Sequence, residues 1–308
     1  MRFFQRKLRY SSECEVEIGR KYISWVACLV SSLFFLYEFI QINMFNSIDS
    51  YVMDAYGLSA KGLGFLSSIY FYSTVAFLLP AGQILDRFPP KKIITLTMFL
   101  CILGIFGFSI TSNLIVAGMC RFLEGIGSAF CFLGSFKIAA NWFPKNKLPF
   151  VTGIIITVGM LGGVIAQTPL TVLISKYGWR EALVMDAFLG ILILAAIFLF
   201  VIDGSTNFKK AQGDEKNKTY WLEMKSVYLN RSNWSCGVYT CLMNSAMVLL
   251  GALWGNLYLE QIHHFSKQDS SIILSMIFIG CIIGSPIFGF LSSAMKNKKK
   301  PMIFGAIL

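Results

Sequence analysis

The feature that most constrains the fold of this chain is a series of long apolar segments. A helix needs roughly 20 residues to cross about 30 Å of hydrocarbon. Segments of this length cover residues 22–45, 62–85, 93–112, 114–136, 150–174, 181–202, 234–259 and 270–293, and a shorter one runs from 301 to 308. With 56% hydrophobic and 14% charged residues, the composition excludes an ordinary soluble domain. We therefore expect an all-α, polytopic membrane helix bundle.

The net charge of +11 reflects membrane topology rather than binding of nucleic acid. If the N-terminus is cytoplasmic, the tail, inner loops and linker carry most of the basic residues. The outer segments then hold only Lys61, Lys176, Arg180 and Lys267. This bias predicts the orientation by the positive-inside rule. The expected partner of the basic residues is therefore the lipid bilayer, and we expect no nucleic-acid partner.

A hydrophilic segment divides the chain into two unequal parts. The sixth apolar segment ends near residue 202, and the seventh begins after a stretch rich in Lys, Asp and Asn. The expected units are a cytoplasmic tail over 1–21, a six-helix half over 22–202, a cytoplasmic linker over 203–232 and an incomplete second half of two to three helices over 233–308.

A charged connection between the second and third apolar segments is the most informative motif. Gly82 would let two helices approach closely. Asp86 and Arg87 follow it at a helix end, and Lys91 and Lys92 come after the turn on the predicted inner side. Charges in so short a connection are typical of a latch between helix ends. We expect these five residues to form a conformational gate.

The same connection resembles the Gly-x-x-x-Asp-Arg-x-Gly-Arg-Arg signature of the major facilitator superfamily of transporters, with Pro89 where that family usually has Gly. A second resemblance lies in Arg121-Phe-Leu-Glu-Gly-Ile-Gly, where Glu124 replaces the usual Gln of the family's fourth helix. In the second half, Gly289, Lys298 and Lys299 repeat the spacing of Gly82, Lys91 and Lys92, and Ser293 stands in the place of Asp86. The resemblance implies two six-helix halves related as repeats, with a substrate cavity between them.

The function that this resemblance implies is secondary active transport, not an enzyme reaction, at a bacterial inner membrane. The expected solute is small and polar and moves by alternating access together with protons. A narrower similarity, in Tyr37-Glu-Phe-Ile-Gln and Met44-Phe-Asn-Ser-Ile, is to phagosomal nutrient transporters. It implies uptake of an amino acid or nutrient by a symporter.

Charged residues inside apolar segments are expensive and usually face a cavity or a partner. At 1.5 Å per residue, Glu38 lies about 24 Å from the inner surface and Arg121 about 10 Å below the outer surface. We predict an ion pair between them. Protonation of Glu38 would then release Arg121 for a carboxylate substrate or a proton relay. The alternative is that both side chains reach the interface. Glu124 could be the relay group instead, and Asp186 is expected at the interface.

Several uncharged residues are further candidates for a substrate cavity. Gln167 follows a glycine-rich stretch in the fifth apolar segment and could present its amide to a polar substrate. The seventh segment holds Asn244, Ser245, Trp254 and Asn256, which ordinary helix packing explains at least as well. The cysteines and histidines form no metal-binding pattern, and no nucleophile or phosphate-binding motif occurs, so we expect neither a metal nor a cofactor.

Two alternatives to a working transporter stay open. The resemblance implies twelve helices, so the chain could be a truncated fragment without transport activity. A membrane sensor or scaffold that keeps the fold without moving solute is the other alternative. Uptake into vesicles would separate both from a transporter.

Overall fold

The structure is a computed structural model that describes residues 2–203, 229–294 and 303, with side chains from residue 22 onward. Apart from short connections, the described residues are helical, which confirms the all-α prediction. The elements are α1 (Arg2–Asn43), α2 (Phe45–Tyr56), α3 (Ala60–Arg87), α4 (Pro90–Ile110), α5 (Leu114–Trp142), α6 (Leu148–Tyr177), α7 (Trp179–Phe200), α10 (Arg231–Ala246), the π-helix η1 (Met247–Trp254), α11 (Gly255–His263) and α12 (Lys267–Ala294).

Seven described helices are long and apolar enough to cross a membrane, and a bent pair makes an eighth if it counts as one span. The first begins at Tyr22 within α1, and the last runs from Lys267 to Ser292. The bent pair joins Arg231–Ser245 to Met247–His263 at 47°. These spans agree with the eight apolar segments of the sequence. Most of the predicted linker, and the apolar segment at 301–308 except residue 303, lie outside the described residues.

The helices end where the sequence supplies local stop and start signals. Gly57 ends α2 in the left-handed region at φ 62°, which glycine adopts without steric cost. The Asn113 side chain caps α5 by accepting the Ile115 N–H at 2.9 Å. Pro90 occupies the first turn of α4, where its missing N–H costs nothing. Among successive described spans only α4 and α5 pack closely along their length, whereas α3 packs mainly against α5 and α4 against α5 and α7.

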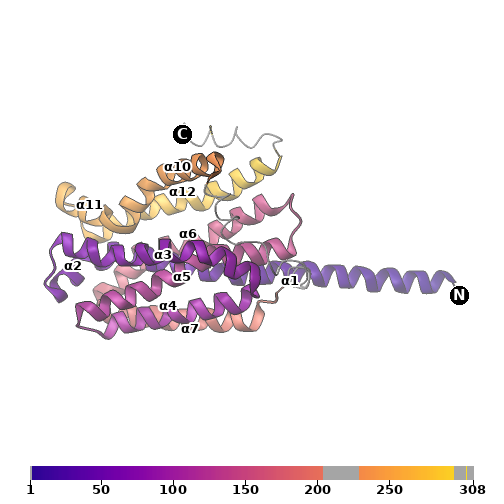
Figure 1. Ribbon diagram of the computed structural model, residues 1–308, viewed down its shortest axis with the longest axis horizontal. Helices are drawn as coiled ribbons and strands as arrows, with labels where there is room; N and C mark the ends of the chain where they lie inside the picture. Colours follow the sequence, from indigo (N-terminus) through magenta and orange to yellow (C-terminus); the bar gives the residue numbers. More distant parts are fainter. Residues whose placement is uncertain (1, 204–228, 295–302, 304–308) are drawn as a thin grey trace.

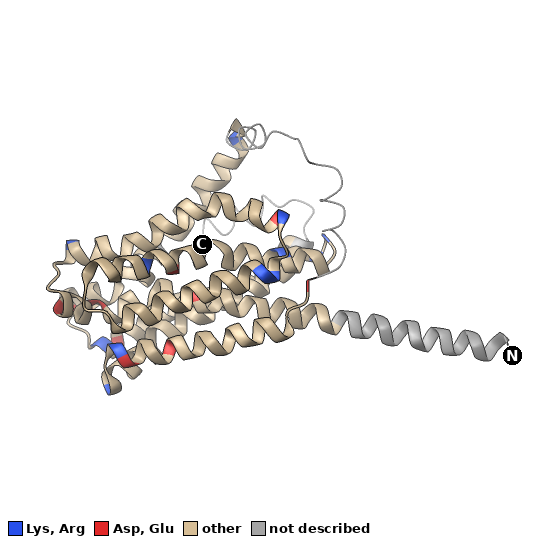
Figure 2. Cartoon of the chain, turned by 60° about the horizontal axis from the view of Figure 1, so that its bottom comes forward, with Lys and Arg blue, Asp and Glu red and all other residues tan. Residues whose placement is uncertain are grey.

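The two ends of the bundle are chemically different. We call the end with the α3–α4 connection the hairpin end, and the opposite end, where α2 and α11 lie side by side in Figure 1, the α2 end. Lys, Arg, Asp and Glu gather mainly toward these ends, while the helices between them are mostly uncharged (Figure 2). Large apolar side chains such as Phe65, Leu192 and Phe198 are exposed on the outer faces, as expected for helices that face lipid.

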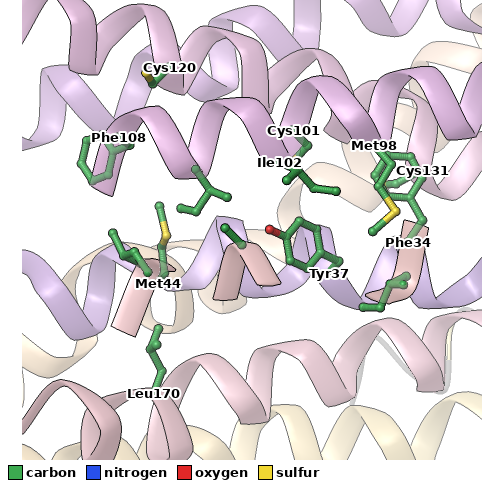
Figure 3. Close-up of a cluster of buried hydrophobic side chains, with 14 of the residues drawn as sticks. Phe34, Tyr37, Met44, Met98, Cys101, Ile102, Phe108, Cys120, Cys131 and Leu170 are labelled. Atoms are coloured by element: carbon green, nitrogen blue, oxygen red, sulfur yellow. The ribbon is translucent and has the colours of Figure 1, made fainter. Parts of the chain in front are cut away.

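The central helix of the first six spans is α1, which packs against α5, α6 and α7. Its Phe34 and Tyr37 belong to a fully buried apolar cluster that Figure 3 shows together with Met98 and Ile102 of α4. On the other side of α6, Gly163 lies against the ring of Phe278 in α12. Helix α6 therefore connects the six-span bundle to the helices that follow residue 229.

Candidate functional site

Arg121 is the largest fully buried side chain among the described residues. Its guanidinium carbon lies 4.4 Å from the ring centre of Phe45 and 4.7 Å from that of Tyr70. The two rings come from α2 and α3, so residues of three elements meet at this cation. Both rings present the negative face of their π-systems to the guanidinium, which offsets part of the cost of burial.

The ionic partner of Arg121 is Glu124, whose carboxylate accepts a hydrogen bond from the Arg121 guanidinium. The direct ion pair with Glu38 that helix depth predicted is therefore not formed, and this prediction was wrong. The reason is local, because residues three apart on a helix are neighbours on one face. Glu124 thus reaches Arg121 within α5.

Glu38 nevertheless lies next to this pair. The Tyr70 hydroxyl donates to Glu38 Oε2 at 3.0 Å, while the ring of the same tyrosine covers Arg121. Glu38, Arg121 and Glu124 are each 0% exposed. The alternative in which Glu38 and Arg121 reach the interface is therefore wrong, and the three charged residues lie in the interior of the bundle.

Glycines provide the space for the two carboxylates. A Cβ atom on Gly127 would lie 2.5 Å from Glu38 Oε1 and 3.0 Å from the Cβ of Cys101. A Cβ atom on Gly104 of α4 would lie 2.7 Å from Glu124 Cγ. Real Cβ atoms do not approach other atoms so closely, so both positions need glycine as the side chains now stand. Gly127 is the last glycine of the motif that begins at Arg121.

The site has hydrogen-bonding capacity that is not used. In the part of the chain that the structure describes, Glu38 Oε1, Glu124 Oε1 and Arg121 Nε are buried without a hydrogen-bond partner. Buried polar atoms are normally paired, and leaving them unpaired costs free energy. A polar ligand or water molecules at this place would use these atoms.

Asp186 is also buried, at 7% exposure, so the prediction that it lies at the interface was wrong. Gln41 of α1 donates its amide to Asp186 Oδ2 at 2.6 Å. The Tyr37 hydroxyl lies beside Gly190, one turn further along α7. The burial of this acidic residue depends on the packing of α7 against α1, which the sequence pattern alone does not reveal.

Gln167 lies at a junction of α2, α6 and η1. Its amide donates to the carbonyl of Gly251 at 2.7 Å and accepts a long contact of 3.4 Å from Asn46. Asn46 also accepts two hydrogen bonds from Asn256, at its Oδ1 from the Asn256 backbone N–H at 2.9 Å and at its carbonyl from the Asn256 amide at 2.6 Å. This network joins the α2 end of the first six spans to the seventh. The sequence pattern does not identify Asn46 as a site residue, because its polar partners lie far away in the chain.

Asn256 of the seventh span is a predicted candidate and belongs to that network, whereas Asn244 and Trp254 lie apart from it. Asn244 is exposed and donates to the Thr240 carbonyl of its own helix at 2.9 Å. Trp254 is half-buried and lies against Gly64 of α3, 3.6 Å from where a Cβ atom would be. Neither contact by itself indicates substrate binding.

The predicted gate at the hairpin end is held by residues of the first six spans. Asp86 forms an ion pair with Lys137 of α5, a residue that the sequence analysis missed, and both side chains are partly exposed. No described atom lies within 4 Å of a Cβ atom built on Gly82, so the expected close helix approach is not made here. Arg87 lies in the last turn of α3, and Lys92 in the first turn of α4.

A second contact at the hairpin end involves Asp203, which follows α7. The Lys91 N–H at the start of α4 donates to Asp203 Oδ1 at 3.0 Å. Burial raises the pKa of Asp203, and the Lys91 N–H together with the charges of Lys91 and Lys92 offsets only part of this effect. Asp203 thus serves as a cap for α4 from a distant part of the chain.

At the α2 end, an ion pair joins α2 to the start of α12. Lys267 Nζ lies 3.3 Å from Asp49 Oδ1 and 2.9 Å from Ser50 Oγ, and 4.5 Å from the ring centre of Tyr51. Burial raises the pKa of Asp49, because loss of solvation outweighs the attraction of Lys267. Together with the network around Asn46, this pair closes the α2 end between α2 and the later helices.

The comparisons with known proteins agree on one family. A model described as Major Facilitator Superfamily matches residues 28–308. The "Probable galactarate/D-glucarate transporter GudP" of Bacillus subtilis (strain 168) is 24% identical, over 80% of this chain and 60% of its own length. The "Probable sulfoacetate transporter SauU" of Cupriavidus necator is 25% identical, over 57% of this chain and 39% of its own.

A bacterial homologue of the human lysosomal transporter Spinster, in an inward-facing and occupied conformation, has a similar fold. Its TM-score is 0.66 at 18% identity, with 88% of this chain and 62% of that one covered. At this identity the likeness concerns the fold alone. The chain spans about 60% of the length of GudP and a similar share of the Spinster homologue.

Proposed function

The chain belongs to the Major Facilitator Superfamily, and on this basis we propose that it moves a small organic anion across a membrane by alternating access. The observation that most supports this proposal is the Arg121 guanidinium, fully buried between two aromatic rings in the interior of a bundle of membrane-spanning helices. A buried cation at this depth is expensive and is usually kept for function.

The surroundings of Arg121 favour a carboxylate as its ligand. The rings of Phe45 and Tyr70 lie against the guanidinium, so a ligand has to approach it from the sides that the rings leave open. Glu124 accepts a hydrogen bond from one end nitrogen of the Arg121 guanidinium, and Arg121 Nε has no hydrogen-bond partner among the described residues. A guanidinium binds a carboxylate through two parallel hydrogen bonds along one edge of its plane. The relatives named above are called transporters of galactarate, D-glucarate and sulfoacetate, which are all organic anions.

Proton coupling follows from the competition between two carboxylates for one guanidinium. When a substrate carboxylate takes the place of Glu124 at Arg121, the Glu124 carboxylate loses its ionic partner inside the bundle. Uptake of one proton by Glu124 then makes it neutral and balances the charge of the one substrate carboxylate that has taken its place. Glu38, held by Tyr70, is the second acidic residue that can take part in this exchange.

The amino-acid substrate predicted from the sequence shares only its carboxylate with this proposal. An amino acid also carries an ammonium group, which Arg121 would repel and which Glu38 or Glu124 would have to bind. Galactarate, D-glucarate and sulfoacetate carry a second anionic group instead. Because the relatives named above are called transporters of such acids, we place organic anions first and keep amino acids as test ligands.

Alternating access is the proposed mechanism, with the two halves divided near residues 203–232. The contacts at the α2 end would separate when the cavity opens on that side. The Asp86–Lys137 ion pair and the Asp203–Lys91 contact would hold the hairpin end of the first half together as one body during this movement. The orientation with a cytoplasmic N-terminus remains part of this proposal.

Ligand binding tests the proposal directly, because it needs the Arg121 site and not a complete transport cycle. Galactarate, glucarate, sulfoacetate and several amino acids are added to the full chain in detergent, and the shift of the melting temperature is measured against ligand concentration. We expect stabilisation by one of the organic anions. The Arg121→Gln variant should bind it about 10 to 100 times more weakly, as expected for a charged hydrogen bond.

Two controls separate the loss of the site from loss of the fold. The double variant Arg121→Gln with Glu124→Gln leaves no unpaired charge in the ion pair and should fold while failing to bind. Lys176→Gln removes an exposed cation from α6 and should bind as the wild type does. Equal affinity in the double variant, or binding of neutral solutes only, would contradict the proposal. Uptake into vesicles then distinguishes a transporter from a scaffold that binds the same anion.

A further inference from the structure

Asp186 lies in a second buried polar group that the proposed mechanism does not use. It is seven residues after Trp179, the first residue of α7, which places it about 10 Å along that helix. Its hydrogen-bond partner is the Gln41 amide at 2.6 Å. Gln41 is 0% exposed and Asp186 is 7% exposed. This carboxylate therefore has a neutral partner, whereas Glu124 has a cation.

The buried charges inside the spans do not balance. In the part of the chain that the structure describes, they are three carboxylates, Glu38, Glu124 and Asp186, and the one guanidinium of Arg121. Arg121 can neutralise one of the three. A charge inside the hydrocarbon region needs a partner or must be neutralised by a bound cation. The two carboxylates that Arg121 does not neutralise are therefore candidates for binding a cation. Asp186 is one of them, and its hydrogen-bond partner is the neutral amide of Gln41.

The neighbours of Asp186 are suited to either state of its carboxyl group. The ionised group accepts a hydrogen bond from the Gln41 NH2, as the structure has it. Gln41 Oε1 and the Tyr37 hydroxyl are buried without a hydrogen-bond partner among the described residues. A 180° turn of the Gln41 amide would present Oε1 as an acceptor for a protonated Asp186. The side-chain amide can thus satisfy both forms of the acid.

We propose that Asp186, Gln41 and Tyr37 form a proton-binding site that is separate from the Arg121 site. Binding forms one O–H bond between the proton and an Asp186 carboxylate oxygen, and this hydroxyl then donates to Gln41 Oε1. Release to water reverses both steps. A metal cation is not the expected ligand, because hard cations take six or more oxygen ligands. The described residues also contain no group of three or more His, Cys, Asp or Glu side chains that could hold a metal ion.

Other ionisable groups lie near enough to Asp186 to interact with it electrostatically. They are Tyr37 of α1, Cys101 of α4 and Glu124 of α5. Glu124 links the two sites, because ionisation of one carboxylate disfavours ionisation of the other. A role of Asp186 in the coupling of protons to substrate rests on the proposed function. The protonation of Asp186 does not, and it can be measured without any substrate.

The test is infrared spectroscopy of the full chain in lipid nanodiscs at neutral pH, without substrate. A protonated carboxyl group absorbs at a C=O frequency that is distinct from those of carboxylates and amides, and this band shifts when D2O replaces H2O. We expect the wild type to show such absorption and Asp186→Asn to lose one component of it, since Glu38 also has a neutral partner and can contribute a component of its own. Gln41→Leu should keep the Asp186 component and shift its frequency, because the hydrogen-bond acceptor is gone. Glu181→Gln, at an exposed position of the same helix, should leave the absorption unchanged.

The outcomes are decisive in both directions. A component that is lost in Asp186→Asn and shifted in Gln41→Leu supports the site even if no organic anion binds to Arg121. Absorption unchanged in Asp186→Asn, or no protonated carboxyl group at all, overturns the proposal. Loss of the Asp186 component from the wild type on replacing choline by sodium would show that a metal cation occupies the site, and it would also overturn the proposal. Retention of the wild-type melting temperature in Asp186→Asn shows that the variant is folded.

Discussion

Tyr70 donates its hydroxyl to Glu38 at 3.0 Å. Because the ring of the same tyrosine covers Arg121, one side chain from α3 holds an acidic residue of α1 and a basic residue of α5. The two charges that the sequence predicted as a direct pair are thus connected through an intermediate residue. This arrangement allows each contact to be removed separately.

Tyr70→Phe should keep the ring over Arg121 and remove the only hydrogen bond that the described structure gives to Glu38. We expect a loss of about 1 to 3 kcal/mol in the free energy of unfolding, the usual cost of a buried polar group left unpaired. Tyr70→Leu removes the cation–π contact as well and should cost more. Melting in detergent measures both. Equal stability of Tyr70→Phe and the wild type would contradict the role assigned to the hydroxyl.

Gly127→Ala should be destabilising, because the new Cβ atom would lie 2.5 Å from Glu38 Oε1. Overpacking of this kind costs about 1 to 3 kcal/mol. The cost should fall when Glu38→Ala removes the opposing carboxylate, so the two changes should not be additive. Gly237→Ala is a matched control, since nothing lies within 4 Å of its added Cβ, and it should be neutral or stabilising. Additive effects of Gly127→Ala and Glu38→Ala would refute the contact.

Glu124 should be coupled more strongly to Arg121 than Glu38 is. In double-mutant cycles with Arg121→Gln, we expect a large coupling energy for Glu124→Gln and a smaller one for Glu38→Gln. Removing one member of a buried ion pair commonly costs about 3 to 5 kcal/mol, part of which the second change should recover. The free energies of unfolding of the four variants in each cycle give the answer. A larger coupling for Glu38 would restore the pairing predicted from helix depth.

Asp203→Asn should change how stability depends on pH. Since burial raises the pKa of Asp203 above its ordinary value of 3.8, the folded state binds a proton more tightly than the unfolded state. Its contribution to stability is fully present below the ordinary value and is lost as the pH rises through the raised pKa. The wild type should therefore lose this contribution in that window, whereas Asp203→Asn should not.

At neutral pH the same position offers a second comparison. Asp203→Asn keeps an acceptor for the Lys91 N–H and should be at least as stable as the wild type. Asp203→Ala removes the acceptor and should cost about 1 kcal/mol, as for the loss of a helix cap. Melting temperatures of the three proteins across a pH series provide the check. A stability that falls in Asp203→Asn as much as in Asp203→Ala would show that the charge, not the acceptor, matters.

The spans could be predicted from the sequence because a membrane helix carries its signal in its own residues. A long apolar run identifies the helix, and a charge inside it, such as Glu38 or Arg121, identifies a buried polar group. The partner of that charge depends on which face of the helix it occupies and on the neighbouring helix. Depth alone placed Glu38 and Arg121 at one level, but it did not show that Glu124 was nearer.

The residues that the sequence did not reveal are those defined by distant contacts. Asp186 is buried through Gln41, which is 145 positions away in the chain, and Lys137 meets Asp86 across 51 positions. The sequence gives no sign that Asn46 forms hydrogen bonds with η1 and α11, which become its neighbours only in the folded chain. No periodicity or motif within one segment reports such pairs. Their recognition needed the packing of helices in three dimensions.

The π-helical segment Met247–Trp254 has a mechanical consequence. The carbonyls of Leu250 and Gly251 accept hydrogen bonds from Asn46, and Gly251 also accepts one from Gln167. The segment just after the bend of the seventh span is therefore held by hydrogen bonds from two helices, α2 and α6, that precede it in the chain by many residues. Straightening the seventh span requires that its hydrogen bonds to α2 and α6 break first. For this reason we expect the bend of the seventh span and the closure of the α2 end to change together. A single substitution at Asn46 or Gln167 should therefore disturb both.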